Sequence, residues 1–319
     1  MRISTTCRVG TAHQITFTTP SPAWECIRLS NLEMRQGKTM DDLFISALQL
    51  NELIDKEIVI LDCRFALNDR AAGLHSYTAG HIPGAIYCDL EKNLSSPVSE
   101  HGGRHPLPDL GELRDFFAHA GINSTATQQS LVVVYDDSKF AFSARCWWLL
   151  NYLGHQNVKL LNGGYRAWCD AGFAVETTIN SPQAGSFDER LPPELATIDV
   201  EKVKSISTAD NANLIDSREE KRFLGIEEPI DPVAGHIPSA QCFPWQEVSD
   251  ANGFIKDQLF HQSRWQVLPA EKPVVVYCGS GVTACVNLLS LNIAGIKDAK
   301  LYPGSWSDWC SYDLPVATE

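Results

Sequence analysis

Short, fully apolar segments alternate along this chain with longer segments of helical periodicity. Residues 132–135 and 274–277 are apolar runs dominated by valine, as expected for buried strands. Residues 110–120 and 144–153 have the length and pattern of helices. Strands without a polar face occur in parallel sheets that are covered on both sides. The pattern therefore predicts an α/β fold, with helices packed on both faces of a parallel sheet.

Several motifs occur twice, in the same order. The segment AGHIPGA at residues 79–85 recurs as AGHIPSA at residues 234–240, a match too long to be explained by composition. Three further pairs surround it: residues 60–64 with 214–218, residues 132–135 with 274–277, and residues 163–168 with 304–309. The chain is therefore predicted to be a duplicated domain.

The boundary between the two copies is predicted at residues 177–197, where three prolines and several small residues are typical of an extended connector. The domains are then residues 44–176 and 198–319. Residues 1–43 form an N-terminal extension that we expect to be poorly ordered. Its basic, Ser- and Thr-rich composition resembles a weak organellar transit peptide, but it lacks a clear amphipathic pattern, which favours a plain extension or an upstream start codon.

Composition and charge exclude several classes of function. The formal net charge of −13 argues against nucleic-acid binding, which requires a basic surface. Ten cysteines are spread over the chain without a C-x-x-C pair, so we expect reduced thiols, a cytoplasmic location and no metal site. No segment approaches the roughly 18 consecutive apolar residues that a membrane span needs, so no membrane partner is expected.

Cys278 is the strongest candidate for chemistry. It follows the apolar run 274–277 and opens the segment CGSGVTA, and a helical run begins at Ala284. The loop amides and the positive end of the helix favour a thiolate over a thiol. A buried cysteine acting as a small hydrophobic residue is the alternative, but Gly279 and Gly281 suit an anion cradle better than a core.

These motifs resemble the tandem-domain rhodanese-like sulfurtransferases, which act on thiosulfate or 3-mercaptopyruvate. The resemblance covers roughly residues 44–317 and implies two tandem rhodanese-like domains, each a parallel sheet with helices on both faces. It also implies that Cys278 attacks the outer sulfur of a small anionic donor and holds it as a persulfide, without a cofactor or a metal. A thiol, cyanide or a thioredoxin-like protein would then accept the sulfur. Asp136 stands at the matching position of the first domain, which therefore lacks the nucleophile.

The resemblance further implies a set of substrate-binding residues. Arg222 matches the arginine that grips the anionic end of the donor. The repetition of His81 and His236 points to a shared loop-fixing role, and for His81 the resemblance also offers a role in proton handling with the loop serine, Ser280, as the alternative. The other predicted contacts come from the cysteine loop, namely Gly279, Ser280, Gly281, Val282 and Thr283.

Two more arginines, Arg64 and Arg218, directly follow strand residues of the two copies. Each lies two positions after an aspartate, Asp62 in the first copy and Asp216 in the second. We expect each arginine to pair with its aspartate or to hold a loop, and so to be structural.

The loop composition bears on the choice of donor. Relatives specialised for thiosulfate commonly carry basic residues after the cysteine, whereas Gly279 and Ser280 follow it here, as in the mercaptopyruvate branch. This favours 3-mercaptopyruvate, with thiosulfate as the alternative. Residues 224–233 lack the second arginine that many mercaptopyruvate enzymes have, so Arg104 of the first domain is a candidate to complete the clamp.

Other classes fit less well. A phosphatase loop of the form Cys-x5-Arg would need an arginine where this chain has Ala284. A persulfide carrier that delivers sulfur to a protein partner, or a thiol redox sensor that uses Cys285 as the resolving residue, remains an alternative to the enzyme.

Overall fold

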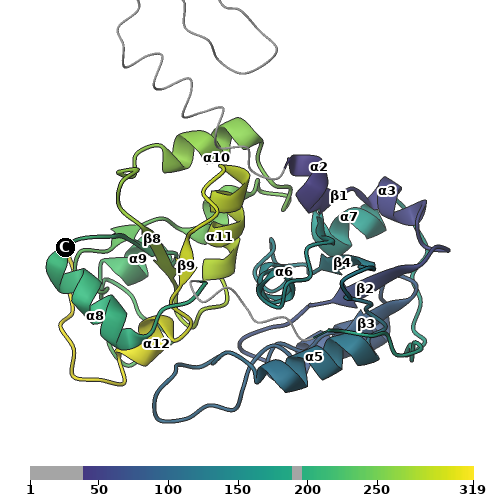
Figure 1. The fold of residues 1–319 in the computed structure, drawn as a ribbon, viewed down its shortest axis with the longest axis horizontal. Coiled ribbons are helices and arrows are strands. Elements are labelled where there is room, and N and C mark those ends of the chain that lie inside the picture. Colours follow the sequence, from purple (N-terminus) through teal and green to yellow (C-terminus); the bar gives the residue numbers. More distant parts are fainter. Residues whose placement is uncertain (1–38, 189–195) are drawn as a thin grey trace, which may run out of the picture.

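The computed structural model describes residues 39–188 and 196–319, which form two α/β domains packed side by side (Figure 1). Most of the predicted N-terminal extension, residues 1–38, and part of the predicted connector, residues 189–195, lie outside the described residues. In the part of the chain that is described, no helix is both long and apolar enough to cross a bilayer.

The first domain contains a five-stranded parallel sheet with the strand order β1-β5-β4-β2-β3. Its strands are β1 (Phe44–Ile45), β2 (Ile58–Asp62), β3 (Ala85–Tyr87), β4 (Leu131–Tyr135) and β5 (Val158–Leu161). Its helices are α2 (Met40–Leu43), α3 (Ala47–Asn51), α4 (Ala72–Ala79), α5 (Leu110–His119), α6 (Ser143–Tyr152) and α7 (Gly164–Asp170).

The second domain contains a four-stranded parallel sheet with the strand order β7-β6-β8-β9. Its strands are β6 (Asn213–Asp216), β7 (Gln241–Cys242), β8 (Val274–Tyr277) and β9 (Lys300–Leu301). Its helical segments are α8 (Val200–Ala209), α9 (Glu220–Phe223), the 3-10 helix η1 (Trp245–Val248), α10 (Gln258–Trp265), α11 (Ala284–Ile293) and α12 (Ser305–Trp309). The predicted architecture of two parallel sheets is confirmed.

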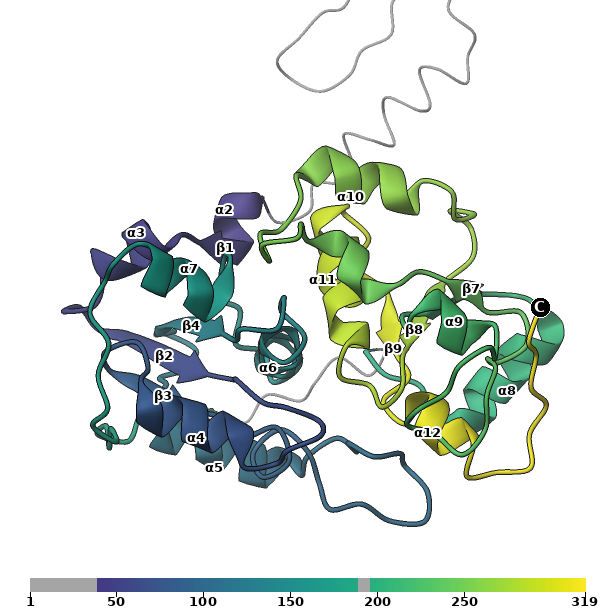
Figure 2. The same cartoon turned by 180° about the vertical axis from the view of Figure 1, so that it is seen from behind.

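The central strands are apolar throughout because both of their faces are buried. In β8, Val274 and Val276 belong to one apolar cluster, whereas Val275 and Tyr277 belong to another on the opposite face. The first of these clusters also includes residues of α6 and α11, which pack against each other between the two sheets (Figure 2). One apolar core therefore runs from the first domain into the second.

A buried arginine ties the end of a central strand to a neighbouring loop in each domain. Arg64 pairs with Asp62 at 2.6 Å and donates to the carbonyl oxygen of Gly80 at 2.7 Å. Arg218 pairs with Asp216 at 2.7 Å and donates to the carbonyl oxygen of Gly235 at 2.6 Å. The structural role predicted for Arg64 and Arg218 is confirmed. The two pairs hold the repeated Gly-His-Ile-Pro segments against the strand ends.

A loop of the first domain crosses onto the second domain at Gly102 and Gly103. The Gly102 amide donates to the Asp308 carboxylate at 2.7 Å. Gly103 has a φ of +82°, and a Cβ there would lie 2.4 Å from the carbonyl oxygen of Gly304, so the contact requires glycine. This close approach carries the next two residues, Arg104 and His105, to the cysteine loop of the other domain.

Candidate active site

A pocket of about 580 Å³ lies between the two domains at the carboxyl end of β8. Parallel sheets bind ligands at this end of their strands. The second domain contributes Arg222 and Trp245 with most of the cysteine loop, and the first domain contributes Phe142 and Arg104. The predicted contacts Cys278, Gly279, Ser280, Val282, Thr283 and Arg222 all line this pocket.

The cysteine loop directs its carbonyl groups away from the pocket and leaves its amide groups unpaired. The amides of Trp306 and Ser307 donate to the carbonyl oxygens of Cys278 and Gly279, at 3.0 and 2.9 Å. Across residues 39–188 and 196–319, no acceptor pairs with the amides of residues 279–283. Unpaired amides at the start of a helix form an anion site. Cys278 itself is only 1% exposed, so its sulfur is held inside this site.

The first domain shows what this loop geometry can hold. Asp136 occupies the position that matches Cys278, and its carboxylate accepts hydrogen bonds from several backbone amides of its own loop, at 2.8 to 3.1 Å. The donors are the amides of Ser138, Phe140, Phe142 and Ser143. The duplicated loop is therefore an anion cradle in both domains, and in the first it holds its own side chain.

Gly281 turns away from the pocket and packs against the neighbouring turn. Its φ is +75°, and a Cβ there would lie 2.3 Å from the carbonyl oxygen of Pro303. Its predicted role as a pocket contact is therefore not matched by its position. Gly281 instead allows the cysteine loop to pass close to the Pro303 carbonyl group.

Two guanidinium groups approach the cradle at Gly279. A Cβ on Gly279 would lie 3.0 Å from an Arg104 nitrogen and 3.6 Å from an Arg222 nitrogen, so the missing side chain makes room for both. Asp231 bridges the two arginines, and Glu228 pairs with Arg222 at 2.8 Å. Arg104 thus completes an arginine pair across the domain interface. An incoming anion must compete with Asp231 for both guanidinium groups.

The two acids that hold the arginines differ in their pKa. Burial raises the pKa of Asp231, and the neighbouring charge of Glu228 adds to this effect, although Arg104 and Arg222 oppose it. Burial also opposes ionisation of Glu228, but hydrogen bonds from Arg222 and from backbone amides lower its pKa overall. Asp231 is therefore the acid that releases the arginines first as the pH falls.

Ser280 is paired with His105, so the proton-handling role considered for His81 with this serine is wrong. The Nδ1 atom of His105 lies 2.8 Å from the Ser280 hydroxyl. Burial, assisted by nearby arginines, lowers the pKa of His105 to about 4, so the ring is neutral at neutral pH. His81 instead lies 2.7 Å from the carbonyl oxygen of Tyr77 and 3.4 Å from Glu176, in the first domain.

The loop-fixing role predicted for His81 and His236 agrees with the geometry of both residues. The Nδ1 atom of His236 lies 2.7 Å from the carbonyl oxygen of Phe223. Each histidine is stacked on an aromatic ring of the helix that precedes its loop, Tyr77 for His81 and Phe223 for His236. Both histidines thus hold the end of that helix.

Arg145 is a buried cation behind the cysteine loop that the sequence analysis missed. It lies in α6, is fully buried, and donates to three backbone carbonyl groups, those of Gly281, Leu94 and His105. No carboxylate of the described residues forms an ion pair with it, and burial lowers its pKa. The groups facing it that can become negative are the thiols of Cys285 and Cys278. The positive charge of Arg145 therefore favours an anion in the cysteine loop.

Comparisons with known proteins agree with this geometry. The family model described as Rhodanese-like domain matches residues 46–171 and 199–312. A Pseudomonas aeruginosa protein that bears the name of a 3-mercaptopyruvate sulfurtransferase is 44% identical over 273 residues, which cover 83% of this chain and 94% of that protein. A Mycobacterium tuberculosis protein, SseB, bears the name of a thiosulfate sulfurtransferase and is 37% identical over 286 residues, or 84% of this chain and 94% of that protein.

A solved structure of the same family has the same fold. The crystal structure of SseA from Escherichia coli, which belongs to the 3-mercaptopyruvate sulfotransferases, superposes with a TM-score of 0.72 at 32% identity. The superposition covers 85% of this chain and all of that chain.

The charge of Arg145 can be tested by substitution. Arg145→Met replaces the guanidinium side chain with an unbranched apolar side chain of similar length and so removes the charge. We expect alkylation of Cys278 by iodoacetamide at neutral pH to slow at least about tenfold, because a nearby opposite charge stabilises an ionised group to that extent. Arg145→Lys should recover part of the rate. Equal alkylation rates in the Met variant and the parent, with both folded by circular dichroism, would show that this charge does not act on the sulfur.

The competition at the arginine pair predicts a pH dependence of anion binding. Sulfate binding to the Cys278→Ser protein, measured by calorimetry, should strengthen as the pH falls from neutrality towards the raised pKa of Asp231, because protonation of Asp231 releases Arg104 and Arg222. Asp231→Asn should bind sulfate about tenfold more tightly at neutral pH and lose the dependence. Glu227→Gln is the matched control, because Glu227 lines the same pocket but pairs with Lys221. A pH dependence that survives in Asp231→Asn would contradict this account.

Proposed function

Since this chain belongs to the rhodanese-like sulfurtransferases, we propose that it transfers sulfur from 3-mercaptopyruvate to a thiol or to cyanide, through a persulfide on Cys278. The observation that carries the proposal is the run of amides at residues 279–283, none of which has an acceptor in the described chain, directly after a cysteine and beside two guanidinium groups. A persulfide is a bulky anion, and this cradle offers both room and dipoles for it.

The proposed reaction has two steps. In the first, the Cys278 thiolate attacks the sulfur of 3-mercaptopyruvate, and the carbon–sulfur bond breaks. Its electron pair leaves on carbon as the enolate of pyruvate, which takes up a proton. In the second step, the acceptor attacks the outer sulfur of the persulfide, the sulfur–sulfur bond breaks, and its electron pair returns to Cys278. The donor and the acceptor balance both steps, so no cofactor is needed.

The pair formed by Ser280 and His105 supports 3-mercaptopyruvate over thiosulfate. Because His105 is neutral, its Nδ1–H can donate to the Ser280 oxygen and leave the hydroxyl proton directed into the pocket. That proton can bind the ketone oxygen of the donor, where negative charge develops as the enolate forms. Thiosulfate releases sulfite, which already carries its charge and needs no such donor.

The arginine pair supports a donor with a carboxylate. The guanidinium groups of Arg222 and Arg104 both approach Gly279. Each offers several N–H groups in its own plane, a geometry that suits the two oxygens of a carboxylate. No basic side chain follows Cys278 inside the loop itself. In this proposal the anionic end of the donor binds at Gly279, and its sulfur points into the cradle.

The acceptor and the location complete the proposal. The pocket opens between the domains, so a small thiol, cyanide or the reactive thiol of a thioredoxin-like protein can reach the outer sulfur of the persulfide. The eight cysteines in the described part of the chain are all free thiols, which supports a reducing compartment such as the cytoplasm.

Loss of the nucleophile tests the persulfide. Cys278→Ser should give no turnover and no gain of one sulfur atom in intact-protein mass after exposure to the donor. Cys285→Ser is the matched control, a second buried cysteine of the same domain, and it should keep both turnover and the mass gain. Turnover by Cys278→Ser would refute the proposal. If the single variant Cys285→Ser loses activity, a redox site that uses both thiols is favoured.

Donor identity is tested with two substrates and two substitutions. We expect a higher kcat/KM for 3-mercaptopyruvate than for thiosulfate. Ser280→Ala should lower the value for 3-mercaptopyruvate about a hundredfold, as loss of proton handling does, and change that for thiosulfate less than about twofold. Arg222→Ala should lower kcat/KM for both donors, by a factor that corresponds to about 1.5 to 3 kcal/mol of transition-state stabilisation, because both donors are anions. Equal losses for both donors in Ser280→Ala would remove the basis for preferring 3-mercaptopyruvate.

A further inference from the structure

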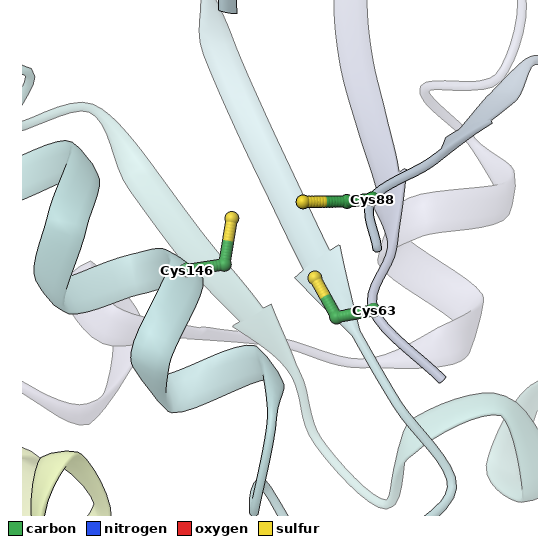
Figure 3. Close-up of side chains that lie close together, drawn as sticks. All are labelled: Cys63, Cys88 and Cys146. Atoms are coloured by element: carbon green, nitrogen blue, oxygen red, sulfur yellow. The ribbon is translucent and has the colours of Figure 1, made fainter. Parts of the chain in front are cut away.

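Three thiols converge in the core of the first domain, apart from the cysteine loop. Cys63 directly follows β2, Cys88 directly follows β3, and Cys146 lies in α6. Their sulfur atoms all lie within 4.8 Å of one another, and no residue of the three is more than 1% exposed. Figure 3 shows the three side chains pointing into the same space between the helix and the strand ends. We call these residues the thiol cluster.

The duplicated domain shows what stands at the same three positions in the second copy. The Cys63 amide donates to the carbonyl oxygen of Tyr135, and the Ser217 amide donates to that of Tyr277 in the same way. The Cys88 and Phe243 amides likewise donate to the carbonyl oxygens of matching strand aspartates. Counting from the first residues of α6 and α11, Cys146 corresponds to Asn287. The thiol cluster therefore matches Ser217, Phe243 and Asn287.

In the second domain these positions are joined by strong hydrogen bonds. The Asn287 amide group donates to the Ser217 hydroxyl at 2.9 Å and to the carbonyl oxygen of Phe243 at 2.7 Å. This ties α11 to the ends of β6 and β7. In the first domain the same place is filled by thiols, which are weak donors and weak acceptors. The helix and the strand ends lack an equally strong polar tie there.

We propose that the thiol cluster binds one thiophilic cation, copper(I), which ties α6 to the strand ends. Metal–thiolate bonds of about 2.3 Å in a plane place the three sulfurs about 4 Å apart, so only a small contraction of the cluster is needed. Elsewhere in the described chain, no histidine, cysteine, aspartate or glutamate joins these three ligands. Three soft ligands without a fourth suit copper(I) better than zinc, which prefers four, and exclude magnesium and calcium.

Binding exchanges protons for the metal ion. The thiolate is the form that ligates a metal, so each thiol that becomes a thiolate ligand releases one proton to solvent. One thiolate and one copper(I) ion give a neutral site, and each further thiolate adds one negative charge. No electron is transferred.

An entry route leads from the pocket between the domains. Phe65 and Phe142 line that pocket and pack edge to face at 5.5 Å. Phe65 lies two residues after Cys63, and Phe142 lies one helical turn before Cys146. Both rings and the thiol cluster belong to the same buried apolar cluster, so movement of the two rings is the route by which we propose that the ion enters.

Metal binding is tested on the full chain with Cys278→Ser, which removes the other candidate thiol at the pocket. Under anaerobic conditions, copper(I) is titrated from a chromophoric chelator. We expect one equivalent to bind, with a near-ultraviolet thiolate-to-copper absorption, three sulfur neighbours at about 2.3 Å by X-ray absorption, and a higher melting temperature.

The second domain supplies the matched variant. Cys63→Ser with Cys146→Asn copies the Ser217 and Asn287 pair, so this protein should fold and melt cooperatively but bind no copper(I). Cys285→Ser, in the other domain, should still bind one equivalent. Binding that persists in the double variant, absence of binding in the Cys278→Ser parent, or zinc held in preference to copper(I) would each overturn the proposal.

Discussion

The packing of α6 against α11 is the contact on which the rest of the active site depends. The two helices share one apolar core between the sheets, and so fix the position of the first domain against the cysteine loop. Arg145 extends from α6 to the Gly281 carbonyl, and the loop carrying Arg104 and His105 crosses the same interface. A single catalytic domain would have the cysteine and its amides but none of these three groups.

The charges around the pocket fall into two groups with different consequences. Arg104 and Arg222 are matched by Asp231 and Glu228, so they are held in place and their charge is largely balanced until an anion arrives. Arg145 donates to three backbone carbonyl groups and lies beside the Cys285 thiol, and no carboxylate of the described residues balances its charge. In the proposed reaction the first group binds the incoming anion, and the second acts on the charge of the loop sulfur.

Features that depend on neighbours in sequence were predictable, whereas contacts between distant segments were not. The order of strand, Cys278, glycines and helix is local, so the sequence predicted the loop, its family and the pocket contacts Ser280 and Arg222. The family resemblance suggested His81 as a partner of Ser280, yet that partner is His105, 175 positions away. Arg145 lay unnoticed inside an apolar helical pattern. The thiol cluster joins residues 63, 88 and 146, a spacing that only the fold brings together.

The carboxylate of Asp136 shows how duplication has divided two demands between the halves of the protein. In the first copy this side chain fills the cradle and pairs with four backbone amides, which adds rigidity but leaves no place for a guest. The matching loop of the second copy has no such side chain, so its amides can bind a guest at the pocket instead. The duplication thus separates a half that serves as a scaffold from a half that keeps its donors for a ligand.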